Sequence, residues 1–251
     1  DSNASRGLGD VYKRQAIKNG DNPKLDIGGF ENLDYVFEAT QLIKSKIDVP
    51  LIGFAGSPWT IFIYSFYGES PKDFNLVREF VAKSPEQTKE ILATYTDVTI
   101  KYLKGQINAG ADCLQVFDSW GGILDQGYEE FSLKFINDIR AAIDPEIPLI
   151  LYARGMKIML HLNATEINCF NLDQNENIDE YINKPITIQG NIDPNDFNQD
   201  EEKVLALAEN IYEKYSQCGN YVCNVGSGIT PDINPNKVGL FLQRLRVLNS
   251  K

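Results

Sequence analysis

The 251-residue sequence lacks any apolar run near the roughly 20 residues that a membrane-spanning helix requires, and it lacks the basic start and apolar core of a signal peptide. Lys and Arg total 24 against 35 Asp and Glu, and the cations do not cluster. Because phosphate binding requires clustered cations, nucleic acid is disfavoured as a partner. We therefore expect a soluble cytoplasmic protein with no membrane or nucleic-acid partner. An anionic small molecule stays compatible with the net charge of −11, because a few local cations or helix N-termini can hold it.

Histidine and cysteine are also scarce. The chain has one histidine, His161, and four cysteines, Cys113, Cys169, Cys218 and Cys223, without a CxxC pair. We find no Ser-His-Asp triad, no metal-ligand cluster and no GxGxxG turn in a Rossmann context, which disfavours hydrolases, metalloenzymes and dinucleotide dehydrogenases. The cysteines are predicted to be small buried hydrophobic residues. His161 is predicted to lie in a helix, in a surface or hydrogen-bonded role rather than a catalytic one.

The chain does contain short apolar runs, and these alternate with amphipathic helical patterns. The predicted strands are Val49–Phe54, Cys113–Phe117, Pro148–Tyr152, Glu166–Phe170, Ile186–Gln189 and Tyr221–Val225. The predicted helices are Asn32–Lys46, Lys72–Lys83, Pro85–Ala109, Gly127–Asp144, Gly155–Ala164, Asp200–Ser216 and Pro235–Leu248. Strict alternation indicates a parallel sheet with right-handed crossovers, and consecutive βα units close most economically into a barrel.

About six βα units are visible, so the predicted fold class is α/β, a (β/α)8 TIM barrel that is incomplete at the N-terminus. Residues 1–30 are rich in Asp, Asn, Gly and Lys and show little periodicity. We expect residues 1–30 to be a poorly structured or non-native leader. Residues 31–251 are then the C-terminal part of a single TIM-barrel domain.

Glycines and polar residues follow the predicted strands at their carboxyl ends, where barrel proteins carry their chemistry. They are Gly53, Gly56, Ser57 and Tyr64, then Asp118–Gly122, then Arg154 and Gly155, then Asp173, then Gln189–Pro194, and finally Asn224–Gly228. We expect these positions to ring one opening. Tyr64 and Ser119 would position polar groups of a ligand, while Phe54, Phe117 and Trp59 would form apolar walls.

Four of these segments resemble the uroporphyrinogen decarboxylase family, in the family's order and spacing. They are Pro50–Thr60 (PLIGFAGSPWT), Gln115–Gly122 (QVFDSWGG), Gln189–Pro194 (QGNIDP) and Asn224–Asp232 (NVGSGITPD). The similarity runs from about Asn32 to the end. It implies a single (β/α)8 barrel, usually dimeric, that works without a cofactor in haem biosynthesis. The implied carboxy-lyase reaction removes carbon dioxide from the four acetate side chains of the tetrapyrrole uroporphyrinogen III and gives coproporphyrinogen III.

The resemblance implies substrate-binding roles for four residues. Tyr64 matches a tyrosine that hydrogen-bonds the substrate, Ser119 a hydroxyl that contacts a substrate carboxylate, and Phe117 an aromatic lining position. The structural alternatives are a core tyrosine, a helix N-cap serine and an ordinary core phenylalanine. Ser227 stands where the family has histidine, in Asn-Leu-Gly-His-Gly. A serine can hydrogen-bond a carboxylate but cannot carry charge or shuttle protons near neutral pH.

The family's catalytic aspartate, and the arginines that pair with substrate carboxylates, belong to a segment that precedes the matched part. We therefore assign no catalytic residue, and we expect this chain to be inactive as given and its complete parent to be an active homodimer. Two alternatives stay open. One is a zinc methyltransferase of the same superfamily, although the ligand-bearing segments, here Leu151–Gly155 and Asn224–Gly228, offer no His or Cys ligand. The other is a non-catalytic porphyrinogen-binding relative.

Overall fold

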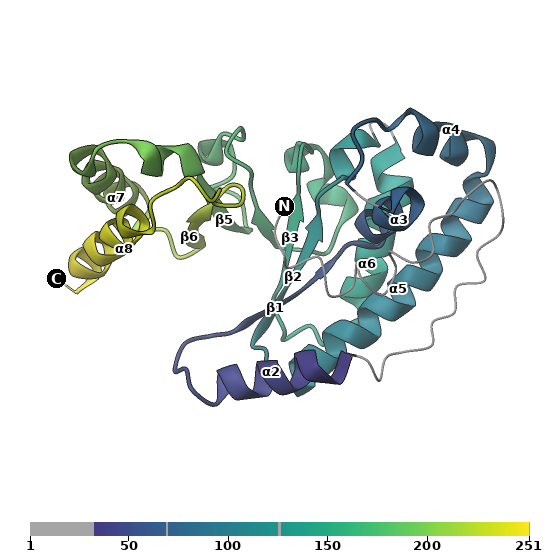
Figure 1. Cartoon of the computed structure of the whole chain (residues 1–251), viewed down its shortest axis with the longest axis horizontal. Helices are drawn as coiled ribbons and strands as arrows, with labels where there is room; N and C mark the ends of the chain where they lie inside the picture. The colour runs from purple at the N-terminus through teal and green to yellow at the C-terminus, as the bar shows by residue number, and fades with distance from the viewer. Residues whose placement is uncertain (1–32, 69, 125–126, 251) are drawn as a thin grey trace. The chain divides into compact units, whose positions relative to one another are not determined.

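The computed structural model describes residues 33–68, 70–124 and 127–250, which form two compact units (Figure 1). The first unit ends at Asn168, and the second begins at Cys169. The expected leader, residues 1–30, lies outside the described residues. None of the helices in the described ranges combines the length and apolar character needed to span a bilayer.

The first unit alternates helices with three strands. Its elements are α2 (Asp34–Lys44), β1 (Ile52–Gly56), α3 (Pro58–Tyr67), α4 (Asn75–Lys83), α5 (Pro85–Asn108), β2 (Cys113–Asp118), the 3-10 helix η3 (Gly121–Ile123), the π-helical turn η5 (Glu129–Leu133), α6 (Lys134–Ala142), β3 (Leu149–Ala153) and the 3-10 helix η6 (Ile158–Ala164). β2 lies between β1 and β3 and pairs with both in parallel, with Phe117 opposite Gly56 on one side and Tyr152 on the other.

The two faces of this sheet differ. Leu114 and Val116 are fully buried on the face that the helices cover, and Gly53 lies so close to α5 that an added Cβ would be 2.8 Å from Oε1 of Gln106. On the other face, the ring of Phe117 contacts those of Phe54 and Tyr152, with centroids 5.9 and 5.8 Å apart. The contacts define an aromatic row, Phe54, Phe117 and Tyr152, that faces away from the helices.

The helical layer of the first unit has its own apolar core. It contains Trp59, Ile61, Phe62, Ile63, Val77, Ile91, Leu92, Tyr95, Phe131 and Phe135, from α3, α4, α5, η5 and α6. α3 is apolar on nearly every side, and seven of its ten residues are buried. Such a helix is stable only inside a core.

The second unit has three strands and two long helices. Its elements are β4 (Cys169–Asn171), η7 (Ile178–Glu180), β5 (Thr187–Ile192), η8 (Pro194–Asn198), α7 (Glu201–Tyr215), β6 (Tyr221–Val225) and α8 (Pro235–Asn249). β5 pairs in parallel with β4 and β6. α7 and α8 pack on each other (Figure 1), and their core includes Ile192, Phe197, Val204 and Phe241.

All six predicted strands are present, and all but one differ from the expected bounds. β1 begins at Ile52 rather than Val49, because the Leu51 N–H donates to Asp112 Oδ2 (2.6 Å) and Val49 is 62 % exposed. β4 has only three residues. The predicted helix Gly155–Ala164 is wrong in type and start: the segment is a 3-10 helix from Ile158, in which only Ile158 is buried. The predicted helix Gly127–Asp144 is a π turn followed by α6.

Candidate functional site

The carboxyl ends of β1, β2 and β3 are joined by backbone hydrogen bonds. The Ser57 N–H donates to the Phe117 carbonyl (2.9 Å), and the Arg154 N–H donates to the Asp118 carbonyl (3.2 Å). The Gly122 N–H then donates to the Arg154 carbonyl (3.1 Å). Three loops therefore form one continuous edge, which we call the strand-end rim: Gly56–Ser57, Ser119–Gly122 and Arg154–Gly155.

Tyr64 contacts the rim through Trp120, the residue that follows Ser119. The Tyr64 ring, in the second turn of α3, lies edge-on to the Trp120 ring with 6.2 Å between centroids. Phe74 packs against the same indole at 5.1 Å. Tyr64 and Ser119 are both partly exposed. Phe117 is also partly exposed, in the aromatic row beside the rim.

Trp59 is not an apolar wall of this site, contrary to the expectation from sequence. Its side chain is 1 % exposed, its ring packs on Phe62 at 5.4 Å, and its Nε1–H donates to the Trp120 carbonyl (2.9 Å). Trp59 instead borders a cavity of about 350 Å³ on the helical side of the unit, together with Ile123 and Phe131. Tyr64, Phe117 and Ser119 do not line this cavity.

Asp118, expected at the opening, is fully buried and points to the helices. Its Oδ1 accepts from the Ser57 hydroxyl (2.7 Å) and, more weakly, from the Thr60 hydroxyl (3.4 Å). Its Oδ2 accepts from the Ser132 hydroxyl in η5 (2.7 Å). Burial raises the pKa of Asp118 to about 6, although the hydrogen bonds from the hydroxyl groups lower it. Asp118 is therefore a buried hydrogen-bond acceptor rather than a group open to a ligand.

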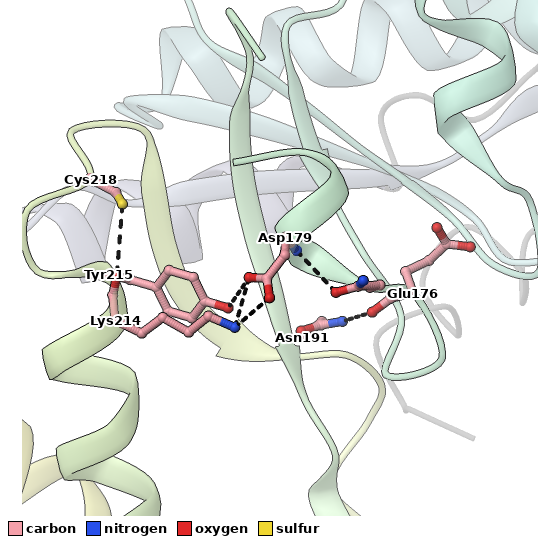
Figure 2. Close-up of polar contacts among 7 residues, drawn as sticks. Glu176, Asp179, Asn191, Lys214, Tyr215 and Cys218 are labelled. Atoms are coloured by element: carbon pink, nitrogen blue, oxygen red, sulfur yellow. Dashed lines mark hydrogen bonds and ion pairs between the residues drawn. The ribbon is translucent and has the colours of Figure 1, made fainter. Parts of the chain in front are cut away.

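The carboxyl ends of the second unit's strands are linked in a similar way. The Gly226 N–H donates to the Ile192 carbonyl (2.8 Å), and the Asn191 amide donates to the Asp173 carbonyl (3.1 Å). The Asn191 amide also donates to the Glu176 carbonyl (2.5 Å; Figure 2). A Cβ on Gly226 would overlap the backbone nitrogen of Gln174, so glycine is required there.

Ser227 directly follows Gly226 and is partly exposed. It belongs to the second unit, whereas Tyr64, Phe117 and Ser119 belong to the first. The grouping of Ser227 with Tyr64, Phe117 and Ser119 stays a prediction.

Two further polar clusters order the second unit. The Gln189 amide donates to Asn171 Oδ1 (2.6 Å), and the Asn224 amide approaches the same oxygen (3.4 Å), so three amides cross β4, β5 and β6. Figure 2 shows how Lys214 and Tyr215 of α7 meet Asp179 of η7. Lys214 Nζ is 2.7 Å from the carboxylate, and the Tyr215 hydroxyl is 3.4 Å from it. These contacts attach α7 to the β4–β5 connection.

The burial of the cysteines differs from the prediction, whereas the role of the histidine agrees with it. All four cysteines are thiols, but only Cys169 is buried, and Cys223 is exposed because its strand, β6, is itself poorly covered. His161 has a hydrogen-bonded role: its Nδ1 is 2.8 Å from Glu129 Oε1, and its ring lies on Tyr128. Within residues 33–68, 70–124 and 127–250, no three His, Cys, Asp or Glu side chains gather in a way that could hold a metal ion.

Solved structures with the same fold include two B12-independent methionine synthases. The putative enzyme from Listeria monocytogenes matches with a TM-score of 0.56 and 17 % identity, over 86 % of this chain and 69 % of that chain. The enzyme from Shewanella sp. W3-18-1, in complex with selenomethionine, matches with a TM-score of 0.59 and 10 % identity, over 85 % of this chain and 66 % of that chain. At such identities the likeness shows the fold alone. It confirms the α/β barrel class, with six parallel strands in the described residues.

Sequence comparison points to one family. Residues 10–247 match the family described as uroporphyrinogen decarboxylase (URO-D), so the similarity begins ahead of Asn32, where it was expected to begin. The uroporphyrinogen decarboxylase of Cellvibrio japonicus is 34 % identical over 88 % of this chain and 65 % of its own length. That of Hydrogenovibrio crunogenus is 33 % identical over 98 % of this chain and 73 % of its own length. The chain thus spans about two thirds to three quarters of these relatives, and it belongs to the uroporphyrinogen decarboxylase family.

Proposed function

We propose that this chain belongs to a cofactor-free carboxy-lyase that converts uroporphyrinogen III to coproporphyrinogen III by decarboxylating its four acetate side chains. Family membership supports the reaction class. The observation that carries the proposal is the approach of Tyr64 to the Ser119–Trp120 turn at the strand-end rim, beside the aromatic row. A tetrapyrrole offers the matching chemistry, because it has a broad apolar ring system and carboxylates at its edge.

Each step of the reaction leaves an electron pair that must be accommodated. The bond between the acetate methylene and its carboxylate breaks, carbon dioxide leaves, and a proton takes its place, so the acetate becomes a methyl group. Protonation of a pyrrole carbon makes the ring a cationic electron sink, and a carboxylate near the pyrrole N–H groups stabilises that cation. Tyr64 and Ser119 would hold and orient substrate polar groups, and Phe117 would exclude water from one side.

No described residue takes the role of the stabilising carboxylate in this proposal. Asp118 is not a candidate, because it is fully buried and occupied by hydroxyl groups. We therefore keep the prediction that this chain alone is inactive and that activity requires the segment with the family's aspartate and arginines. Ser227 as a carboxylate ligand, a homodimeric parent and a cytoplasmic location also stay predictions.

The direct test is an anaerobic assay with uroporphyrinogen III, with porphyrin products separated after oxidation. We expect product from the chain extended by its native upstream sequence and none from the chain as given. In the extended chain, Tyr64→Phe should lower kcat/KM roughly 10- to 100-fold, as expected for losing a hydrogen bond to a charged group. Tyr35→Phe is the matched control, because Tyr35 is 57 % exposed on α2, away from the rim.

Two outcomes would replace the proposal. An extended chain that binds uroporphyrinogen but releases no carbon dioxide would be a non-catalytic relative. Stoichiometric zinc together with methyl transfer to a thiol would support the methyltransferase alternative.

A further inference from the structure

The Asp118 carboxylate, at the end of β2, connects three elements of the first unit. Its Oδ1 accepts from the Ser57 hydroxyl at the start of α3, and its Oδ2 accepts from Ser132 in η5, both at 2.7 Å. The Ser57 oxygen in turn accepts from the Thr60 N–H (3.0 Å), which makes Ser57 the N-cap of α3. One side chain therefore joins β2, α3 and η5.

This arrangement is costly for the fold. The partners of the buried carboxylate are hydroxyl groups rather than cations, so its desolvation is only partly offset. A neutral or apolar residue of similar size would avoid that cost. Proteins do break such a packing rule at functional sites.

The rim is built directly on this carboxylate. A Cβ on Gly121 would lie 2.5 Å from Asp118 Oδ2, so the turn that follows Ser119 packs against the carboxylate with no space between them. Trp59, in the first turn of α3, donates its Nε1–H to the Trp120 carbonyl (2.9 Å). The same helix carries Tyr64, whose ring contacts Trp120. The Ser119–Gly122 turn and α3 are thus tied to Asp118 and to each other.

We propose that Asp118 is a positioning residue for the strand-end rim: its carboxylate fixes the start of α3 and the Ser119–Gly122 turn, and so sets where Tyr64 and Ser119 lie. Asp118 does not touch a ligand, because none of its surface is exposed. The importance of this positioning for catalysis rests on the proposed function. The positioning itself can be measured without any substrate.

Tryptophan fluorescence reports on this place alone, because the chain has two tryptophans and both, Trp59 and Trp120, adjoin the turn. The experiment measures acrylamide quenching of the folded protein at pH 7.5 for the wild type, Asp118→Asn and Ser132→Ala. Ser65→Ala is the matched control, because Ser65 is also buried but donates to the Ile61 carbonyl instead (2.9 Å). Trp120→Phe assigns the signal to Trp120.

We expect the quenching constant to rise about twofold in Asp118→Asn and by a smaller factor in Ser132→Ala, because loss of these bonds allows the turn to open locally. Ser65→Ala should match the wild type. Wild-type quenching in both rim variants, even with a lower unfolding midpoint, would overturn the proposal and leave Asp118 a purely structural role. If Asp118→Asn does not fold, Ser132→Ala decides by the same criterion. Since no substrate is present, failure of the decarboxylation assay would not alter this result.

Discussion

The end of β2 shows how neighbouring residues can have opposite roles. Asp118 is fully buried against the helices, whereas Phe117 and Ser119 on either side of it are partly exposed. Side chains of a strand alternate between the faces of a sheet, so Asp118 shares its face with Leu114 and Val116. From the sequence, Asp118 was grouped with the residues of the opening. Leu114, Val116 and Asp118 are every second residue of the strand, and this alternation could have shown from the sequence that Asp118 faces the core.

Asp118 should also make the free energy of unfolding depend on pH. Its pKa in the folded state, about 6, lies above its ordinary value of 3.8, because burial favours the neutral form. The folded state therefore binds this proton more tightly. The resulting stabilisation is complete below pH 3.8 and is lost as the pH rises through 6. Between pH 5 and pH 7.5 the free energy of unfolding of the wild type should fall by roughly 1 to 2 kcal/mol relative to that of Asp118→Asn.

Urea unfolding of both proteins over this pH range measures that difference. The groups that face Asp118 are the hydroxyls of Ser57, Thr60 and Ser132 and the phenol of Tyr128, beyond which His161 pairs with Glu129. All of these groups except Asp118 itself are the same in both proteins, so the comparison isolates the effect of the Asp118 carboxyl group. A difference that stays constant from pH 5 to pH 7.5 would refute the prediction.

At the scale of elements, helices with strong local boundaries were predicted best. α5 was predicted within one residue, since Pro85 occupies its first position and Gly110, with φ of +105°, follows its end. Its boundaries therefore follow from local chemistry. The segments Gly127–Asp144 and Gly155–Ala164 were predicted as α-helices, but their starts depend on contacts distant in sequence. One such contact is the Ser132–Asp118 bond, which no local pattern reveals.

The middle of α8 offers a prediction for a single element. Gly239 lies inside the helix, and a Cβ placed there would meet no atom within 4 Å. Gly239→Ala should raise the free energy of unfolding by about 0.5 to 1 kcal/mol, because alanine restricts the unfolded chain more than glycine does. Gly226→Ala is the contrasting variant and should destabilise the protein, since its Cβ would overlap Gln174. Chemical denaturation measures both, and a loss of stability in Gly239→Ala would contradict an open helix surface there.

At the scale of the molecule, charge rather than any one contact predicts how the protein responds to salt. The formal net charge is −11, and the ion pairs are mostly on the surface, such as Lys44–Asp112 and Lys134–Asp138. Surface pairs of this kind contribute little to stability. Repulsion among the excess carboxylates should therefore outweigh the attraction within the pairs.

The melting temperature should accordingly rise by a few degrees between about 10 and 200 mM NaCl, because salt screens the repulsion. Differential scanning fluorimetry at pH 7.5 is sufficient to measure the change. KCl should act like NaCl, since screening depends on ionic strength and not on the cation. A melting temperature that falls with salt would show that attractive pairs dominate.

The sequence by itself determined the α/β class, the six strands in their order, the family and the strand ends at which polar residues gather. These features follow from the period of apolar residues and from turn chemistry, both of which act over a few residues. Only the tertiary structure decided that Trp59 is buried, that Asp118 turns inward and that η5 and η6 are not α-helices. The reason is physical: burial and hydrogen-bond partners come from elements far apart in the chain, as Ser57 and Ser132 do around Asp118.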